Sequence, residues 1–320
     1  MPRKPASQKT AQSAIASVTK TPPPLVPAPA RSRTPAPSPA LDLGCHLSIA
    51  KGLPAMYDQA LAVGATCAQI FTRNPRGGAR REIDDTELAQ AATRRAGAGV
   101  RTVIAHIPYT VNPASPRPHA LEFARMVLRD DLRHADRLGA QFVVFHPGSH
   151  VDAGVAEGTR RIVETVRLAL DGYDGDAMLL LEGMSGGGSE IGGTPDELRA
   201  IVDGLGGDPR VGVCLDSCHL FAAGWDLRTR DGIERCLDAF DRALGLDRVR
   251  CLHLNDCKSA LGSHKDRHAK IGEGELGAQG IRQVVTHPFF ATLPLCLETP
   301  VDDWPEYQAE IAAVRRLAGG

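Results

Sequence analysis

The segment VGVCLDSCHLFAAGWDLR at 211–228 joins a short apolar run to two residues that could bind a metal ion. The run 211–215 is typical of a buried strand; it ends at Asp216, and His219 follows three residues later. A carboxylate at a strand end and an imidazole on the next loop suit a metal site at the carboxyl edge of a parallel sheet. Two structural roles compete with this interpretation. Asp216 could cap the next element, and His219 could be a hydrogen-bonded core residue.

Other apolar runs carry a histidine or an acid at the same place. These residues are His46, His106, His146, Glu182, His253 and Glu298, with Asp266 and His268 further along the chain. Only the run 67–71, which leads into FTRN, has no obvious ligand at its end. If the runs are parallel strands of one barrel, their carboxyl ends meet at one mouth.

Nine of these residues would then share one small volume. They are His106, His146, Glu182, Asp216, His219, His253, Asp266, His268 and Glu298. Crowded carboxylates repel one another and lose hydration, and bound cations would resolve that conflict. A mixture of imidazoles and carboxylates suits zinc or manganese better than calcium or magnesium. If one carboxylate bridges two ions, the nine residues fill three sites, and multi-metal clusters of this kind catalyse phosphoryl chemistry.

The elements that must position these residues alternate regularly from residue 41 onward. We expect strands at 43–47, 67–71, 102–105, 142–145, 178–181, 211–215, 249–254 and 293–297. Helical segments are expected at 53–63, 84–98, 120–138, 156–170, 195–203, 231–244, 278–285 and 302–317. This α/β pattern predicts a (β/α)₈ TIM barrel with a metal cluster at its C-terminal mouth. A doubly wound open sheet is the main alternative.

Composition divides the chain into a short arm and a large body. Residues 1–40 contain ten of the 23 prolines, six Lys or Arg and no acid, so we expect a disordered basic arm there and one barrel domain at 41–320. The body carries a net charge of −7, which argues against broad binding to a phosphate backbone. The arm could touch DNA loosely, it could be a transit-like segment or the product of an over-called start site, or it could be a solvated tail without a specific function.

The eight cysteines include no C-x-x-C pair, and several lie in apolar runs. They predict a reducing compartment, no disulfide framework and no cysteine-type zinc site. No apolar run approaches the length of about 18 residues that a membrane helix needs. We therefore expect a protein of the bacterial cytoplasm or nucleoid.

Five motifs together resemble the endonuclease IV family of AP endonucleases. They are HPGSH, VCLDSCHLFAAGWDLR, HLNDCKS, DRH followed by GEGELG, and LET, and the resemblance runs from about residue 44 to 317. It implies a TIM barrel with three zinc ions per chain, in part replaceable by manganese. It also implies cleavage of double-stranded DNA on the 5′ side of abasic sites, which leaves a 3′-hydroxyl.

The resemblance also implies a ligand set and catalytic roles. His106, His146 and Glu182 would hold one ion. Glu182, Asp216, His253 and Glu298 would hold a second, and His219, Asp266 and His268 a third. Glu182 would bridge the first two ions, and Glu298 would orient the attacking water.

Arg76 and Tyr109 match the family's loop positions that enter the DNA duplex and help to flip the abasic nucleotide out. Thr110 stands where the family commonly has leucine. Gly183 and Met184 replace polar residues after the bridging glutamate, which puts support for the ligands in doubt.

Two other functions stay open at this stage. A xylose isomerase-like sugar isomerase would use Glu182, Asp216, His253 and Glu298, but it leaves the other five candidate ligands unexplained. A non-catalytic DNA-lesion binder would keep the fold without turnover. We expect abasic duplex DNA as the partner, no membrane, no obligate protein partner and a monomer.

Overall fold

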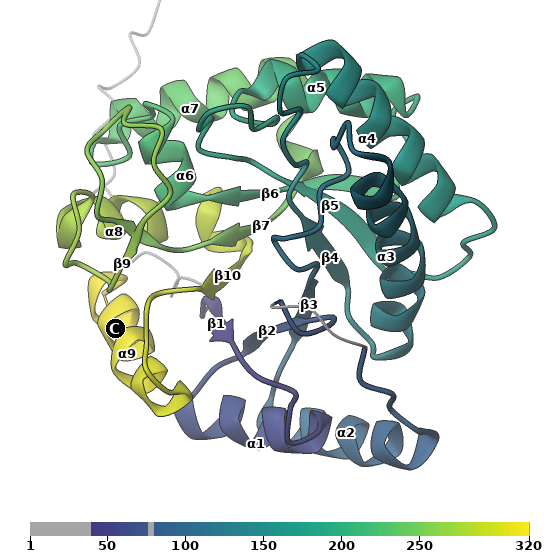
Figure 1. Cartoon of the computed structure of the whole chain (residues 1–320). Helices are drawn as coiled ribbons and strands as arrows, with labels where there is room; N and C mark the ends of the chain where they lie inside the picture. Colours follow the sequence, from purple (N-terminus) through teal and green to yellow (C-terminus); the bar gives the residue numbers. More distant parts are fainter. Residues whose placement is uncertain (1–39, 76–79, 320) are drawn as a thin grey trace, which may run out of the picture. The chain divides into compact units, whose positions relative to one another are not determined.

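The computed structural model describes residues 40–75 and 80–319. In this part of the chain, parallel strands close into a barrel in the order β1-β10-β7-β6-β5-β4-β3-β2. The strands are β1 (Asp42–His46), β2 (Cys67–Phe71), β3 (Thr102–His106), β4 (Phe142–Phe145), β5 (Met178–Glu182), β6 (Val211–Asp216), β7 (Val249–His253) and β10 (Pro294–Leu297). Figure 1 shows helices arranged around this ring of strands. The TIM-barrel prediction is confirmed, and the open-sheet alternative is wrong.

The helices follow the strands in alternation. They are α1 (Leu53–Val63), α2 (Asp85–Ala98), α3 (Pro118–Arg137), α4 (Val155–Leu170), α5 (Pro195–Gly204), α6 (Ser217–Ala222), α7 (Arg230–Leu244), α8 (Gly277–Val285) and α9 (Tyr307–Leu317). Three 3₁₀ turns, η1 (Leu246–Arg248), η2 (Phe290–Thr292) and η3 (Trp304–Glu306), join them. Local chemistry sets several boundaries. The Asp84 carboxylate caps α2 by accepting from the Glu87 N–H, and Gly64 ends α1 in the left-handed region at φ 74°.

Two elements at the mouth were not predicted. Helix α6 begins directly after Asp216, whose carboxylate accepts a hydrogen bond from the His219 N–H at 2.9 Å. The short strands β8 (Asp256–Cys257) and β9 (His268–Ala269) pair antiparallel beyond the end of β7. Both elements carry candidate ligands. The expected helix at 302–317 is also divided into η3 and α9.

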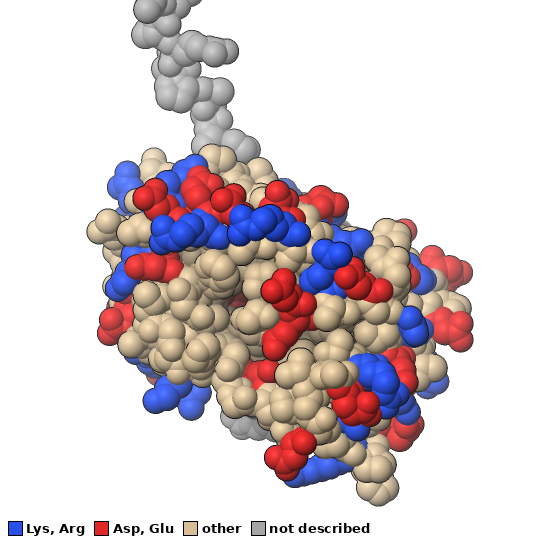
Figure 2. Space-filling view, turned by 90° about the horizontal axis from the view of Figure 1, so that it is seen from above, with Lys and Arg blue, Asp and Glu red and all other residues tan. Residues whose placement is uncertain are grey.

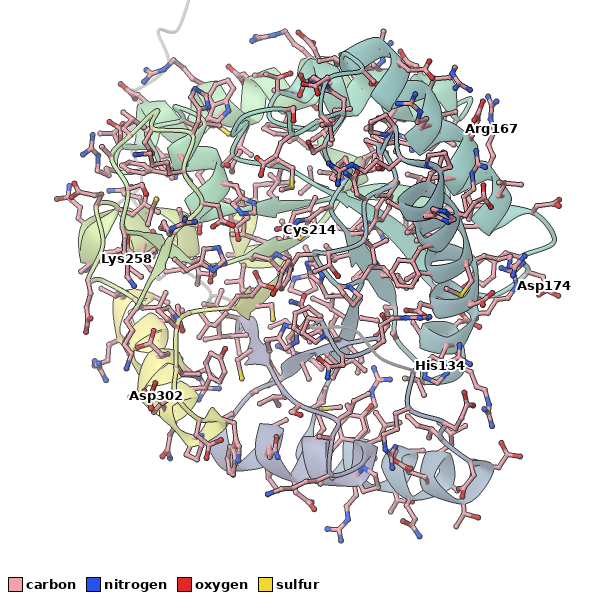
Figure 3. The ribbon with its side chains drawn as sticks, viewed as in Figure 1. His134, Arg167, Asp174, Cys214, Lys258 and Asp302 are labelled. Carbon is pink, nitrogen blue, oxygen red and sulfur yellow. The ribbon has the colours of Figure 1, made fainter. Side chains whose placement is uncertain are left out.

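The barrel interior holds its own buried cluster, separate from the large core between strands and helices. One residue from each of seven strands forms it: Cys67, Ile104, Val144, Leu180, Cys214, Cys251 and Cys296. Figure 3 shows Cys214 near the middle of the molecule, among the strands, whereas Arg167 and Asp174 lie at the outer edge of the molecule, on and beyond α4. The remaining strand contributes Gly44, which pairs with both Cys67 and Cys296. A Cβ on Gly44 would lie 1.5 Å from the Cys67 carbonyl oxygen, so only glycine allows β1 and β2 to approach this closely.

The interior residues determine which side chains reach the mouth. Side chains two positions apart on a strand point the same way, so the residue two places after each interior residue also faces the barrel axis, nearer the carboxyl end. Those residues are His46, Gln69, His106, His146, Glu182, Asp216, His253 and Glu298. Seven of the eight were singled out from the sequence. Gln69 was missed.

Charged side chains of both signs are interspersed on the face shown in Figure 2, where basic and acidic groups adjoin. Arg199–Asp203 and Arg230–Glu234 illustrate the exposed pairs, each spaced four residues apart along a helix. None of the described helices is long and apolar enough to cross a membrane. The arm predicted at 1–40 lies outside the described residues, apart from Ala40.

A buried ion pair anchors the loop after β2 to α3. The Arg73 guanidinium donates from Nε to one oxygen of Asp131 at 2.8 Å and from an Nη atom to the other at 2.5 Å. The Asp131 side chain is fully buried, and that of Arg73 is only 10% exposed. This planar two-point contact fixes the start of a loop at the barrel mouth.

Removing Asp131 should therefore destabilise the fold. We expect Asp131→Ala to lower the free energy of unfolding by about 3–5 kcal/mol, because it leaves the Arg73 charge buried without a partner. Urea denaturation measures this effect. Asp85→Ala is the control, since it removes the exposed partner of Arg137 and should change stability little. A loss in Asp131→Ala no larger than in the control would show that the buried pair is dispensable.

Candidate metal centre

Glu182 lies at the centre of the barrel mouth, where its side chain is 1% exposed. Its Oε2 atom is 3.1 Å from Nε2 of His106 and 3.2 Å from Nε2 of His146. Its Oε1 atom is 3.1 Å from Nδ1 of His253. The two carboxylate oxygens therefore face two different sets of imidazoles, which is the arrangement that a bridging carboxylate requires.

The nine candidate ligands fall into three groups whose donor atoms lie within 4.8 Å of one another. The groups are His106, His146 and Glu182; Glu182, Asp216, His253 and Glu298; and His219, Asp266 and His268. Their membership is that expected from the sequence, with Glu182 shared by the first two groups. Two further combinations also meet this distance, His106, His253 and Glu298, and Asp216, Cys218 and His268. They draw on the same volume, so the cluster offers overlapping positions for cations.

The third group depends on the two elements that the sequence did not reveal. His219 lies on α6, and Asp266 and His268 come from the segment that ends in β9. The two Asp266 oxygens lie 3.3 Å from Nε2 of His219 and 3.2 Å from Nε2 of His268. Both of these Nε2 atoms are buried and make no hydrogen bond. Buried nitrogens without partners are rare, and these two, facing one carboxylate, fit a bound cation.

Backbone carbonyl groups orient three of the histidines. Nδ1–H of His106 donates to the Ile107 carbonyl at 2.6 Å, and Nδ1–H of His219 donates to the Gly183 carbonyl at 2.9 Å. His268 donates in the same way to the Glu298 carbonyl at 3.2 Å. Each contact leaves Nε2 directed at the cluster with its lone pair available, as metal-binding histidines need.

The charges of the cluster shift the pKa values of its members. Burial raises the pKa of Glu182, but the charges of His253 and His146 and a hydrogen bond with His106 outweigh burial and hold that pKa well below its usual value. Burial lowers the pKa of His219 and His253, yet their carboxylate neighbours raise both well above the usual range. The same balance raises the pKa of His268 to about 9. The site therefore stabilises positive charge, and a bound cation would replace the imidazolium protons.

A cleft of about 740 Å³ opens beside the cluster. Among the residues that line it are His46, Phe71, Glu298, Asp302 and Trp304. The Glu298 side chain is 18% exposed, so it links the buried cluster to this open space. The geometry therefore offers a cation cluster with a buried centre that meets solvent at Glu298, beside the cleft, and at Asp266, whose side chain is 41% exposed.

The comparisons with known proteins point to one family. A family model described as a xylose isomerase-like TIM barrel matches residues 57–317. A protein of Moorella thermoacetica named probable endonuclease 4 is 48% identical over 276 residues, which cover 86% of this chain and 98% of that protein. The crystal structure of endonuclease IV from Thermus thermophilus gives a TM-score of 0.76 at 36% identity, and covers 86% of this chain and 97% of that one. The chain belongs to the endonuclease IV family.

The barrel is also found in proteins named for other reactions. A D-psicose 3-epimerase structure gives a TM-score of 0.60 over 88% of this chain and all of that chain, but the identity is 15%. That likeness shows the barrel alone. It has no bearing on the third group of candidate ligands or on the two histidines that face Glu182 Oε2, which are observed in this member of the endonuclease IV family.

Two residues that the sequence analysis did not single out, Asn255 and Asp256, support the cluster and the loop beside it. The Asn255 amide donates to Asp216 Oδ2 at 2.7 Å, and its oxygen accepts from the Glu298 N–H at 2.9 Å. Asp256 accepts from the backbone N–H groups of Gly272, Gly274 and Leu276 at 3.0, 3.0 and 3.1 Å. The GEGELG loop is therefore wound around a buried carboxylate. The sequence did offer a signal. Asn255 and Asp256 stand in the motif HLND beside the candidate ligand His253, just as Asp216 and Glu298 stand in the motifs DSCH and LET.

The remaining residues predicted from the sequence lie at the rim of the barrel mouth or outside the residues that the structure describes. Tyr109 is 58% exposed in the turn that follows β3, and the neighbouring Thr110 hydroxyl donates to the Pro75 carbonyl at 3.4 Å. Arg76 lies outside the described residues. Gly183 and Met184 stand where the family has polar residues after Glu182. The Gly183 carbonyl accepts a hydrogen bond from His219, and Met184 is buried. The backbone thus provides part of the support that polar side chains would give.

Glu182→Gln tests whether the two first groups share one carboxylate. We expect a folded protein that binds fewer metal ions, because the amide keeps the size but removes the charge that separates two cations. Elemental analysis of purified, metal-loaded protein measures the effect, and His106→Ala should also lower metal content. Glu190→Gln is a control outside the cluster. Normal metal content in both Glu182→Gln and His106→Ala would contradict the shared site.

Proposed function

We propose that this chain is an AP endonuclease of base excision repair. It hydrolyses the phosphodiester on the 5′ side of an abasic site in double-stranded DNA and leaves a 3′-hydroxyl. The observation that carries this proposal is the convergence of three groups of candidate ligands, two of which share Glu182, in a chain 48% identical to a probable endonuclease 4. Clusters of this kind suit phosphodiester hydrolysis because both attacking and leaving oxygens need stabilisation.

The proposed cofactor is zinc, three ions per chain, with manganese as the alternative occupant of part of the cluster. Five imidazoles and four carboxylates make up the donor set, which is zinc-like in composition. All eight cysteines are buried and free, and one of them, Cys218, belongs to an overlapping group. When bound, the ions lower the pKa of water and polarise phosphate oxygens.

Glu182 and Glu298 are the proposed catalytic residues. Burial raises the pKa of Glu298, but the charge of His253 and the hydrogen bond with His46 outweigh it and hold the carboxyl well below its usual pKa. Glu298 is therefore ionised at neutral pH. An ionised carboxylate beside the cleft can accept a hydrogen bond from a water molecule and aim it at the phosphate, while Glu182 holds the first two groups together.

The proposed contacts with DNA are local. The chain from residue 41 onward carries a net charge of −7, which argues against binding through a broad basic surface. Tyr109 offers an exposed aromatic ring at the mouth, and Arg76 is proposed to act beside it. An abasic nucleotide is the easiest to extrude because no base pair has to be broken. We further propose that the protein is a monomer. We also propose that it acts in the bacterial cytoplasm, because its cysteines are free, as in a reducing compartment.

The sugar isomerase alternative is not favoured. Its four-residue set is present as the group of Glu182, Asp216, His253 and Glu298. That set gives no role to the third group, nor to the two unpartnered nitrogens of His219 and His268. The endonuclease function uses all three groups.

A synthetic duplex with one abasic site tests the function. We expect metal-dependent cleavage that gives a 3′-hydroxyl end, no cleavage of the same duplex without the lesion, and loss of cleavage after chelation. Adding zinc should restore it. Tight binding without cleavage by fully loaded protein would favour a lesion binder, and interconversion of ketoses without DNA cleavage would favour an isomerase.

Tyr109→Ala tests damage recognition. We expect weaker discrimination between abasic and intact duplex, by about 1–3 kcal/mol, because a stacked aromatic ring is lost. Competition binding measures the discrimination, and metal content should not change. Leu168→Ala, which removes an exposed apolar side chain near the C-terminal end of α4, is the control. Unchanged discrimination in Tyr109→Ala would place the recognition elsewhere.

A further inference from the structure

Gln69 occupies one of the eight strand positions that face the barrel mouth, and the other seven are histidines or acids. Its side chain comes from β2, where Gln69 pairs in register with His46 of β1. The residue is fully buried. A buried primary amide has four hydrogen-bonding sites to satisfy, so its partners show what it does.

The first partner is His253, which is oriented differently from the three histidines held by backbone carbonyls. Its Nδ1 atom faces the cluster, 3.1 Å from Glu182 Oε1 and 3.4 Å from Glu298 Oε2. Its Nε2–H points away and donates to Gln69 Oε1 at 2.8 Å. A side chain therefore does for His253 what main-chain carbonyls do for His106, His219 and His268.

The second partner is Glu298. The Gln69 Nε2 group donates to Glu298 Oε1 at 2.6 Å and also lies 3.1 Å from Nδ1 of His46. These contacts determine which way the amide is turned. The opposite orientation would place the amide oxygen 2.6 Å from a carboxylate oxygen, two acceptors with no proton between them.

We propose that Gln69 is a positioning residue that holds two ligands of the second group at once. Its oxygen fixes His253 with Nδ1 free for the cation. Its NH₂ group fixes Glu298 Oε1, so that Oε2 stays turned toward His253. The inference rests on the proposed metal-dependent endonuclease function, and it assigns a role to the one strand whose run showed no ligand.

A neutral amide suits this position better than the alternatives. A carboxylate would also accept from His253, but it would face Glu298 as a second negative charge. An apolar side chain would leave the His253 Nε2–H and a Glu298 oxygen buried without a partner. Gln69 therefore supplies one acceptor and one donor without adding charge.

The test compares Gln69→Leu and Gln69→Glu with Gln141→Leu. The control removes a glutamine that bonds the backbone at Val103 and Arg101, just before β4 begins and so at the opposite end of the barrel. Metal affinity is measured by competition with a chelator, and the Nε2–H proton of His253 is followed by NMR in zinc-loaded, histidine-labelled protein. Kinetics on abasic duplex give kcat and KM separately.

In Gln69→Leu we expect a loss of about 10–100-fold in affinity for one ion or in kcat, with KM little changed, and an upfield shift of the His253 proton. Gln69→Glu should keep the His253 proton hydrogen-bonded, with no upfield shift, and should keep the metal bound, because the acceptor remains, but it should lower kcat, because the donor to Glu298 is gone. Gln141→Leu should match the wild type in all three measurements.

Wild-type metal affinity, His253 signal and kcat in a folded Gln69→Leu would overturn the proposal. If Gln69→Leu does not fold, Gln69→Glu decides: an unchanged kcat or an upfield shift of the His253 proton would overturn it. If the wild-type protein does not cleave abasic DNA, the proposed function fails. The metal and NMR measurements still decide whether Gln69 positions His253.

Discussion

The molecule is organised around one buried carboxylate surrounded by imidazoles. Glu182 has almost no contact with solvent, and rings of His106, His146, His219 and His253 lie within 3.4 Å of its oxygens. A charge in that position is costly unless positive charge accompanies it. The neighbouring histidines can supply protons and bound cations can replace them, so the demand for cations is built into the fold.

The strands meet this demand through their simplest property, the alternation of side chains. A layer of small and apolar residues fills the barrel below, and four of its seven members are cysteines. Two positions on, the same strands direct their polar residues into one layer at the carboxyl end. The apolar layer keeps water from entering beneath the cluster. The cleft opens beside this polar layer at Glu298.

The parts outside the barrel strands complete the cluster. Helix α6 and the β8–β9 hairpin bring His219, Asp266 and His268 together, and buried Asp256 holds the loop that follows. The sugar epimerase that shares the barrel at 15% identity shows that the strand framework alone does not specify a reaction. A third cation beside a bridged pair suits a phosphodiester, whose charge must be neutralised as its bonds rearrange.

The sequence by itself determined the eight strands, most of the helices and the nine candidate ligands. It could do so because apolar runs and the polar residues that close them are local patterns, and because the family's motifs are long. Only the tertiary structure decided the role of Gln69, which lies inside an apolar run, two residues after Cys67, and looks like part of the strand. Gln69 acquires its role from His253, 184 residues away, and from Glu298, 229 residues away. The orientation of His253, with Nδ1 toward the cluster, and the winding of GEGELG around Asp256 also depend on contacts between residues that are distant in the sequence. Hydrogen bonds between distant side chains depend on how the barrel closes, and no local pattern encodes that closure.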